Sequence, residues 1–454
     1  MQMSYSNDTI VALATARGQA GVGIVRLSGP EAIAIAGRLV SRMPAPRQAS
    51  LQVLSDASGE AIDQGIVLCF PAPHSYTGED VVELQCHGSP VVLDSIVKTV
   101  CEFGARLARN GEFSERAFLN DKLDLAQAEA IADLIESGSE AAARAAMRSL
   151  QGGFSDAVNT LTTAVTELRM HVEAAIDFPE EEIDFLDDAA LLQRIDATRE
   201  QFDALQAQIK MGQAMTDGLT IVLAGAPNVG KSSLLNQLVG HDAAIVTDIA
   251  GTTRDLVRER TTIEGLPVEF VDTAGLHATD DIVELEGIRR SRDSVRTADH
   301  SLLMVDANAA GWQQQVASLL DEVPSELPKT VLLNKTDLLT EAVAAPALLD
   351  GVPVLAVSAR TGHGIAELRQ HLLAAAGVDE QQETSFSARR RHVVAITDAR
   401  AAFDAGVTQL QQFKAGELFA EELRQSQQAL AEITGRFTSD DLLGRIFGEF
   451  CIGK

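Results

Sequence analysis

The sequence predicts a multidomain protein: an α+β domain first, then an α-helical bundle into which an α/β domain with a phosphate-binding loop is inserted. Residues 216–377 alternate apolar runs with helix-like stretches, which is typical of a parallel sheet covered by helices. Residues 121–215 and 378–454 instead repeat apolar residues at the spacing of long helices. Residues 1–120 hold short strand-like runs divided by turn residues. These four ranges are the predicted domain boundaries, with 378–454 completing the bundle.

The order of elements follows from the same patterns. In the first domain we expect strands at 9–14, 21–29, 66–70 and 81–86 and helices at 30–40 and 91–103. In the first part of the bundle we expect helices at 125–135, 140–150, 156–176 and 189–213. The second part should hold helices at 395–412 and 418–433. An insertion of this kind is tolerated because the termini of a domain are often close together.

The composition is that of a globular, strongly acidic protein. The chain has 454 residues, 46% of them hydrophobic, and a formal net charge of −28. This charge argues against a protein that simply coats nucleic acid. The four cysteines have no metal-ligand spacing, which fits a reducing compartment. Because we find no signal-peptide pattern and no apolar run of about 18 residues, we expect a cytoplasmic protein without a membrane span.

The most informative stretch is Gly-Ala-Pro-Asn-Val-Gly-Lys-Ser at residues 225–232, between the apolar run 219–224 and a helix-like segment. Small residues let successive backbone N–H groups surround a phosphate chain, and the helix N-terminus adds a favourable field. We expect Lys231 to reach the outer phosphates and the Ser232 hydroxyl to bind Mg²⁺. The predicted contacts from this loop are Asn228, Val229, Gly230, Lys231, Ser232 and Ser233.

Three further polar stretches each follow a strand-like apolar run. They are Asp272-Thr273-Ala274-Gly275, Asn334-Lys335-Thr336-Asp337 and Ser358-Ala359-Arg360. Asp272 is expected to hold Mg²⁺ through water, and the Gly275 N–H to face the γ-phosphate. The Asp337 carboxylate can accept hydrogen bonds from the N1–H and exocyclic amine of guanine, which adenine does not offer. A backbone N–H of the third stretch would face the guanine carbonyl, so the four stretches in this order predict GTP binding.

The group that orients the attacking water is harder to assign. Small Ras-like GTPases carry Gln directly after Asp-x-x-Gly, whereas this chain carries Leu276, which cannot orient water. Glu284 is one candidate among several nearby carboxylates, and a solvated helix charge is the plain alternative. Asn228 could bind a monovalent cation beside the phosphates, and Thr253 could close on Mg²⁺ when the γ-phosphate is present.

Several of these stretches resemble the MnmE (TrmE) family, the tRNA-modifying GTPases of bacteria and organelles. The resemblance covers nearly the whole chain. It is most specific at Gly-Glu-Phe-Ser-Glu-Arg-Ala-Phe-Leu-Asn-Asp-Lys-Leu-Asp (111–124), at the nucleotide stretches and at the terminal Cys-Ile-Gly-Lys. It implies a homodimer through the N-terminal domain, which binds 5-formyl- or 5,10-methylene-tetrahydrofolate. It also implies a potassium-stimulated GTPase that works with the flavin-dependent partner MnmG (GidA). Together they add an aminomethyl or carboxymethylaminomethyl group to the wobble uridine of certain tRNAs.

The resemblance also assigns residues around the nucleotide. It implies that Ser232 and Thr253 hold magnesium and that Glu284 positions the water, with Lys231 and Asp272 as the other catalytic groups. It implies that potassium is held by Asn228, Thr247, Ile249 and Thr252. The whole loop expected to close over the nucleotide is Thr247, Asp248, Ile249, Ala250, Gly251, Thr252 and Thr253.

For the folate, the resemblance implies contacts from Arg26, Glu83, Lys122 and Lys454. Two kinds of charge suit this ligand, since cations can bind its glutamyl or formyl oxygens and a carboxylate can accept from the pterin donors. The plain alternatives are salt bridges at the rim for Arg26 and Lys122 and a core-edge position for Glu83.

Two other functions remain open at the level of sequence. One is a regulatory GTPase in ribosome assembly, whose N-terminal domain only dimerises. The other is a GTP-gated folate enzyme that acts on a small molecule. The folate residues favour tRNA modification over the first, and the terminal Cys-Ile-Gly-Lys with the helical scaffold favours it over the second. For Cys451 a functional role, as a nucleophile or as a group near the folate, and a role as a small apolar anchor are equally open.

Overall fold

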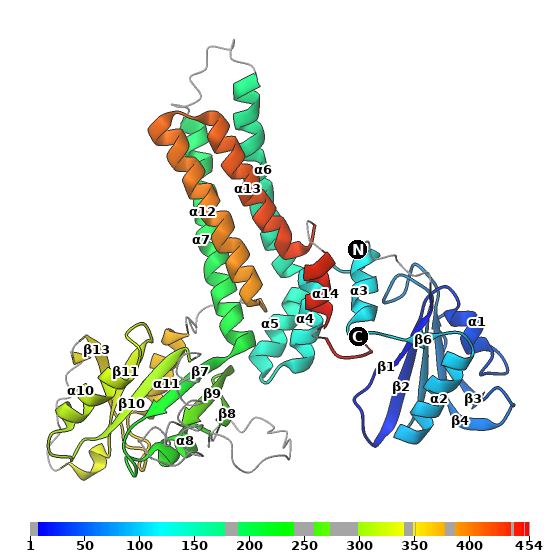
Figure 1. Ribbon diagram of the computed structural model, residues 1–454, viewed down its shortest axis with the longest axis horizontal. Helices are drawn as coiled ribbons and strands as arrows, with labels where there is room; N and C mark the ends of the chain where they lie inside the picture. The colour runs from blue at the N-terminus through cyan, green and yellow to red at the C-terminus, as the bar shows by residue number, and fades with distance from the viewer. Residues whose placement is uncertain are drawn as a thin grey trace. The chain divides into compact units, whose positions relative to one another are not determined.

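The computed structural model describes residues 8–177, 189–239, 258–272, 298–339, 348–349, 351–376, 386–436, 440–448 and 450–453 (Figure 1). The chain divides into two compact units. One comprises Met1–Ala132 with Gln427–Lys454, and the other comprises Asp133–Ser426. Helices α4 (Leu125–Glu136) and α13 (Gly416–Thr434) each contain a point of division.

The first unit is built on a six-stranded sheet in the order β3-β4-β5-β2-β1-β6. Its strands are β1 Ile10–Leu13, β2 Ala20–Ser28, β3 Ser50–Ser55, β4 Ala61–Phe70, β5 Val81–Gly88 and β6 Arg106–Leu107. Helices α1 (Ala32–Gly37) and α2 (Pro90–Glu102) cover one face, where alternate strand residues such as Val25 and Leu84 form the core. Strand β3 was not predicted, because Leu54 is its one fully buried side chain while Leu51 and Val53 are exposed.

Helix α3 (Glu112–Leu119) was also missed by the sequence analysis, because it buries charges. Glu112, Glu115 and Arg116 are at most 8% exposed. Arg116 forms ion pairs with Asp8 at 2.8 Å, Glu79 at 3.0 Å and Glu112 at 3.1 Å. Burial opposes ionisation of Glu112, but hydrogen bonds from Arg106 and Arg116 outweigh it and lower the pKa of Glu112 to about 2.

The C-terminal residues belong to this same unit. Helix α14 (Asp440–Gly448) contributes Phe447, which packs with Leu125 and Phe118. Beyond it, Ile452 forms an antiparallel bridge with Asn110. A Cβ atom on Gly453 would clash with the Leu13 carbonyl, so this position must be glycine for the end of the chain to lie there.

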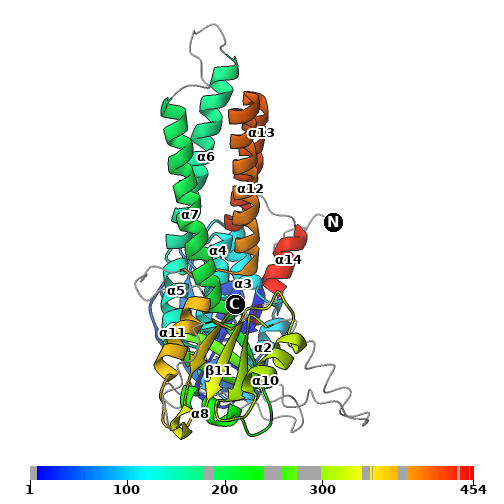
Figure 2. The same ribbon diagram turned by 90° about the vertical axis from the view of Figure 1, so that its left-hand side faces the viewer.

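Long helices form the first part of the second unit (Figure 2). They are α5 Glu140–Leu150, α6 Gly153–Asp177, α7 Ala189–Asp217 and α12 Arg390–Phe413. These bounds agree closely with the predicted helices at 140–150, 156–176, 189–213 and 395–412. Helix α12 packs along α7, with the Phe202 and Phe403 rings 5.2 Å apart, so α12 joins the helices that precede the α/β part.

The inserted α/β part contains a seven-stranded sheet in the order β12-β13-β11-β10-β7-β9-β8. Its strands are β7 Leu219–Ala224, β8 Arg258–Ile263, β9 Leu266–Asp272, β10 His300–Asp306, β11 Lys329–Asn334, β12 Leu348–Leu349 and β13 Val352–Ala356. Helices α8 (Lys231–Val239) and α11 (Ile365–Ala375) pack on one face and α10 (Trp312–Glu322) on the other. The five central strands are parallel, and the two pairs β8–β9 and β12–β13 are antiparallel. The predicted multidomain fold is therefore confirmed.

Near the amino ends of these strands, the buried His300 lies close to His371 of α11, which is half-buried. The Thr330 hydroxyl lies 2.9 Å from His300 Nε2 and 2.7 Å from His371 Nε2. Burial, and then the neighbouring His371, lower the pKa of His300 to about 4, and burial also lowers the pKa of His371. The folded protein therefore holds His300 neutral at pH values where the unfolded chain binds a proton.

We expect acid to destabilise this α/β part through His300. The contribution is fully present above the unfolded pKa of 6.5 and is lost as the pH falls through the folded pKa of about 4. The loss should reach about 3 kcal/mol of unfolding free energy. Urea unfolding between pH 7 and 4 measures it, because the single tryptophan, Trp312, lies on α10 and reports this part of the chain.

His300→Gln should flatten this pH dependence, since glutamine does not titrate. The matched control is His363→Gln, because His363 is exposed and should leave the profile unchanged. A His300→Gln profile as steep as that of the wild type would contradict the assignment.

Candidate nucleotide-binding site

The predicted phosphate loop connects β7 to the first turn of α8. Three of its residues have a positive φ, namely Gly225, Asn228 and Gly230. A Cβ on Gly225 would clash with the Met304 carbonyl, and a Cβ on Gly230 with the Asn334 amide. The loop is therefore held tightly against the neighbouring strands and needs glycine at both places.

The functional groups of this loop have distinct surroundings. Lys231 is 7% exposed, and its Nζ donates to the Gly225 carbonyl at 3.1 Å, so the ammonium folds over the loop. Asn228, Ser232 and Ser233 are exposed, whereas Val229 is buried. Asn228 and Ser232, which are predicted to bind cations, thus lie where a ligand can reach them.

The predicted guanine-recognition residues come together beside this loop. The Asn334 amide is 2% exposed; its Nδ2 donates to the Val229 carbonyl at 2.7 Å, and its Oδ1 accepts from the Ala359 N–H at 3.0 Å. Ser358 Oγ donates to Asp337 Oδ1 at 2.7 Å, which orients the exposed carboxylate. Three separate loops, after β7, β11 and β13, therefore form one site.

Two of the N–H groups expected near the guanine carbonyl have partners within the protein. The Ala359 N–H binds Asn334, as above, and the Ser358 N–H donates to the His363 carbonyl at 2.9 Å. Arg360, the third residue of this stretch, is exposed.

Strand β9 ends at Asp272, and its backbone lies next to Leu223 of β7 in the parallel register. The predicted magnesium-binding stretch therefore starts at the same edge of the sheet as the phosphate loop. Several predicted residues lie outside the described part of the chain: Thr247, Asp248, Ile249, Ala250, Gly251, Thr252, Thr253, Thr273, Ala274, Gly275, Leu276 and Glu284.

The sequence analysis missed two residues at this edge: Asp306, the last residue of β10, and Asn308, which lies just after it. Asp306 Oδ2 lies 2.8 Å from Lys335 Nζ, and Asn308 Nδ2 donates to the Lys335 carbonyl at 3.0 Å. The signal was available, because Val-Asp-Ala-Asn follows the apolar residues 302–304 just as the other polar stretches follow their strands.

In the first unit, two of the four predicted folate residues form a pair. Arg26 and Glu83 face each other across β2 and β5 and form an ion pair at 2.8 Å, with 21% and 17% of their side chains exposed. The Arg26 guanidinium carbon lies 5.3 Å from the centre of the Tyr76 ring and 5.8 Å from that of Phe113. The sequence analysis did not single out these two aromatic residues.

The other two predicted folate residues are not part of this pair. Lys122 Nζ donates to the Pro73 carbonyl at 2.9 Å, so it is bound to the loop that also carries Tyr76. Lys454 lies outside the described residues. Burial raises the pKa of Tyr76, whose hydroxyl lies 2.8 Å from Ser114 Oγ.

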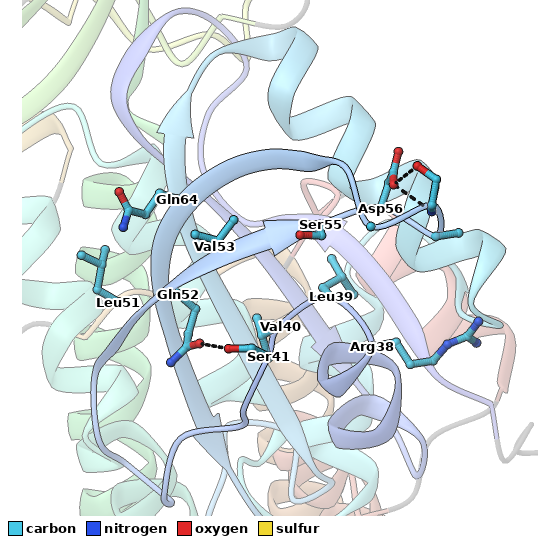
Figure 3. Close-up of a pocket in the computed structure, with 13 residues that line it drawn as sticks. Arg38, Leu39, Val40, Ser41, Leu51, Gln52, Val53, Ser55, Asp56 and Gln64 are labelled. Carbon is cyan, nitrogen blue, oxygen red and sulfur yellow. Dashed lines mark hydrogen bonds between the residues drawn. The ribbon is translucent and has the colours of Figure 1, made fainter.

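A separate cavity of about 720 Å³ lies in the first unit, along β3 and the turn that follows it (Figure 3). Its charged residues have partners, since Arg38 donates to the Phe103 carbonyl and Asp56 accepts from Ser58 and Glu60. It contains none of the predicted site residues.

In the described part of the chain, no helix is long and apolar enough to cross a membrane.

Comparison with known proteins identifies the family. The model of the MnmE helical domain matches residues 125–451, and the model described as GTP-binding protein TrmE N-terminus matches residues 9–122. The tRNA modification GTPase MnmE of Pseudomonas aeruginosa (strain UCBPP-PA14) is 54% identical over 455 residues and covers 100% of both chains. That of Pseudomonas syringae pv. tomato is 53% identical over 456 residues, again with full coverage of both chains.

Among solved structures, the FeoB G-domain from Methanococcus jannaschii is 26% identical and covers 35% of this chain and 97% of its own. Its TM-score is 0.27, and at this value the likeness carries no argument. The two family models and the full-length identity of the relatives agree with the joined loops of the nucleotide site. The chain belongs to the MnmE family of tRNA modification GTPases.

Proposed function

We propose that this chain hydrolyses GTP to drive modification of the wobble uridine of certain tRNAs, together with a flavin-dependent partner of the MnmG (GidA) type. The added group would be an aminomethyl or carboxymethylaminomethyl group on C5. The observation that carries the GTP assignment is the Asn334 side chain, which joins the phosphate loop to the stretch after β13. Family membership supports the coupling to tRNA. We place the protein in the cytoplasm.

The protein's own residues would act mainly by placing charge and orienting water. Lys231, folded over the loop at Gly225, would neutralise the outer phosphates. Ser232 and Thr253, with Asp272 through water, would hold Mg²⁺, which supplies further charge neutralisation when bound. The exposed Asn228 side chain, with Thr247, Ile249 and Thr252, would hold K⁺ beside the phosphates. The oxygen-rich character of these side chains and carbonyls suits both cations.

We propose that the first unit binds a tetrahydrofolate carrying the one-carbon group. The residues fit such a ligand, since Arg26 and Glu83 supply opposite charges at a partly exposed position beside the Tyr76 and Phe113 rings. Lys122 and Lys454 would add cations for the glutamyl carboxylates. We also propose that this N-terminal domain, residues 1–120, forms the homodimer. The helical domain would comprise 121–215 and 378–454, and the GTPase domain inserted into it would comprise 216–377.

Analysis of tRNA nucleosides tests the proposed function. Cells that lack this protein should lose the modified wobble uridine, and the wild-type gene should restore it. The same gene carrying Asp337→Asn should restore it poorly. Unchanged nucleosides in the deletion strain would overturn the proposal.

Asp337→Asn should weaken GTP binding by roughly 1–3 kcal/mol, because the variant loses a charge-assisted pair of hydrogen bonds to guanine. Calorimetry or a fluorescent GTP analogue measures the affinity. The same variant should gain affinity for xanthosine nucleotides, whose ring presents an acceptor where guanine has a donor. If Asp337→Asn binds GTP as tightly as the wild type, this carboxylate does not recognise the base.

Glu284→Ala should lower the rate of GTP hydrolysis on the order of 10²-fold or more if Glu284 orients the water. GTP affinity should be nearly unchanged, because the carboxylate acts only in the transition state. Single-turnover hydrolysis in saturating potassium gives the rate.

The wild-type protein should hydrolyse GTP slowly when sodium replaces potassium, if Asn228 and its loop hold K⁺.

The neighbouring carboxylates serve as controls for Glu284. Asp280→Ala and Glu286→Ala should hydrolyse GTP at nearly the wild-type rate if one position alone is aimed at the nucleotide. A wild-type rate in Glu284→Ala would mean that another group orients the water.

A further inference from the structure

We propose that Asp306 and Asn308 are positioning residues that fix the guanine-recognition loop and thereby set its selectivity for the base. Neither residue belongs to the four nucleotide stretches. The inference rests on the proposed recognition of guanine by Asp337, which it deepens. It assigns to the turn after β10 a role in choosing between guanine and related bases.

The loop contains a backbone conformation that needs support. Lys335 has a φ of 64° and a ψ of 34°, in the left-handed region, where a residue with a Cβ atom is disfavoured. It directly precedes the short 3₁₀ helix Thr336–Leu338, which carries Asp337. If Lys335 relaxed to a right-handed conformation, the direction of the chain would change one residue before Thr336, and the Asp337 carboxylate would move with it.

Asp306 and Asn308, at the end of β10 and just after it, bind both the side chain and the backbone of Lys335. Asp306 pairs with its ammonium at 2.8 Å, and Asn308 Nδ2 donates to its carbonyl at 3.0 Å. A third bond joins the same two segments, since the Ala307 N–H donates to the Asn334 carbonyl at 2.9 Å. The side chain and the backbone of Lys335 are thus both fixed from the β10 side.

Asp306 and Asn308 also fix each other. Asp306 Oδ1 accepts from the backbone N–H of Asn308 at 2.9 Å and from its side-chain amide at 3.2 Å. Burial opposes ionisation of Asp306, but hydrogen bonds from Lys335 and Asn308 outweigh it and lower the pKa of Asp306. The Asp306 carboxylate is therefore charged at neutral pH and can hold both partners.

The opposite side of the loop is held by residues after β13. Thr336 Oγ1 donates to the Val357 carbonyl at 3.0 Å, and Ser358 Oγ donates to Asp337 at 2.7 Å. Asp337 therefore lies between two supports. Loss of the β10 support should leave the loop held from the β13 side alone, through Thr336 and Ser358, so that the Asp337 carboxylate can turn away from the geometry that pairs with two donors of the base.

A plain surface ion pair is the alternative for Asp306 and Lys335. Their side chains are 29% and 32% exposed, and such pairs often contribute little. What distinguishes this pair is that Asp306 also binds Asn308, whose side chain donates to the backbone carbonyl of Lys335, a left-handed residue. An effect on base selectivity, as opposed to general stability, separates the two roles.

The test compares affinities for GDP and inosine diphosphate, which lacks the exocyclic amine that Asp337 is proposed to bind. In Asp306→Asn the affinity for GDP should fall about tenfold, as for the loss of one charge-assisted hydrogen bond. The affinity for inosine diphosphate should fall less, so the ratio of the two affinities should shrink. Asn308→Ala should change the ratio in the same direction, and it replaces Asp306→Asn if that variant does not fold.

The matched control is Asp299→Asn. Asp299 precedes the amino end of the same strand and accepts from the Thr220 N–H at 2.8 Å, so it makes a similar contact at the opposite edge of the sheet. Both affinities should stay at wild-type values in this variant. Equal losses for both nucleotides in Asp306→Asn and Asn308→Ala, or no loss, would overturn the inference.

Asp337→Asn in the same assay separates this inference from the proposed function. If Asp337→Asn keeps the wild-type ratio, guanine recognition by Asp337 is wrong and the inference falls with it. If Asp337→Asn removes the preference for GDP and Asp306→Asn retains it, the proposed recognition stands and the positioning role is wrong.

Discussion

The buried Asn334 side chain is the interaction on which the nucleotide site depends. Its two ends bind the backbone of two other loops, at Val229 and Ala359, so one amide sets the distance among three loops. If one end of a buried amide lost its partner, the cost would be about 1–3 kcal/mol. The same contact explains Gly230, because any side chain there would occupy the position of the amide. The three loops are consequently joined by backbone groups that bind one buried side chain.

The interiors of the two units differ in the kind of side chain that they bury. The second unit buries continuous apolar strands, such as β10, between helices on both faces of its sheet. The first unit buries helix α3 with its charges, and each of them has an opposite partner, as Glu112 has in Arg106 and Arg116. Burial of a charge is tolerable only with such partners, because an unpaired one costs several kcal/mol. Removal of one member would therefore disturb the others more than removal of an exposed pair.

Most of the fold could be predicted from the sequence, because the apolar periodicity of the long helices and of the parallel strands is strong. Helices α5, α6, α7 and α12 fell within a few residues of their expected bounds, apart from the first turns of α12. Helix α3 could not be found in this way, since its buried side chains are charged and become compatible with the interior only through ion pairs, some of them to residues distant in sequence such as Asp8 and Glu79. Strand β3 was missed because an edge strand buries one face only partly.

For the candidate site, the sequence predicted which stretches come together but not how they are joined. The motifs at 225–232 and 334–337 are defined by residue type and order, which the sequence contains. The bond from Asn334 to Val229 and the support of Lys335 by Asp306 depend on which strands are neighbours, and the order of strands in the sheet is a property of the fold. The pairing of Arg26 with Glu83 was likewise a matter of register between β2 and β5.

The division of the chain inside helices α4 and α13 has a practical consequence for the preparation of fragments. A cut between Ala132 and Asp133, or between Ser426 and Gln427, would interrupt a helix and leave its backbone groups without their partners one turn away. The segment 218–376 is different, because it begins at Gly218, whose φ of +76° ends α7, and finishes just after α11. Excision at those two points cuts through no described helix or strand. Fragments for crystallisation or labelling should therefore begin at Gly218 and end just after α11, where the inserted α/β part begins and ends.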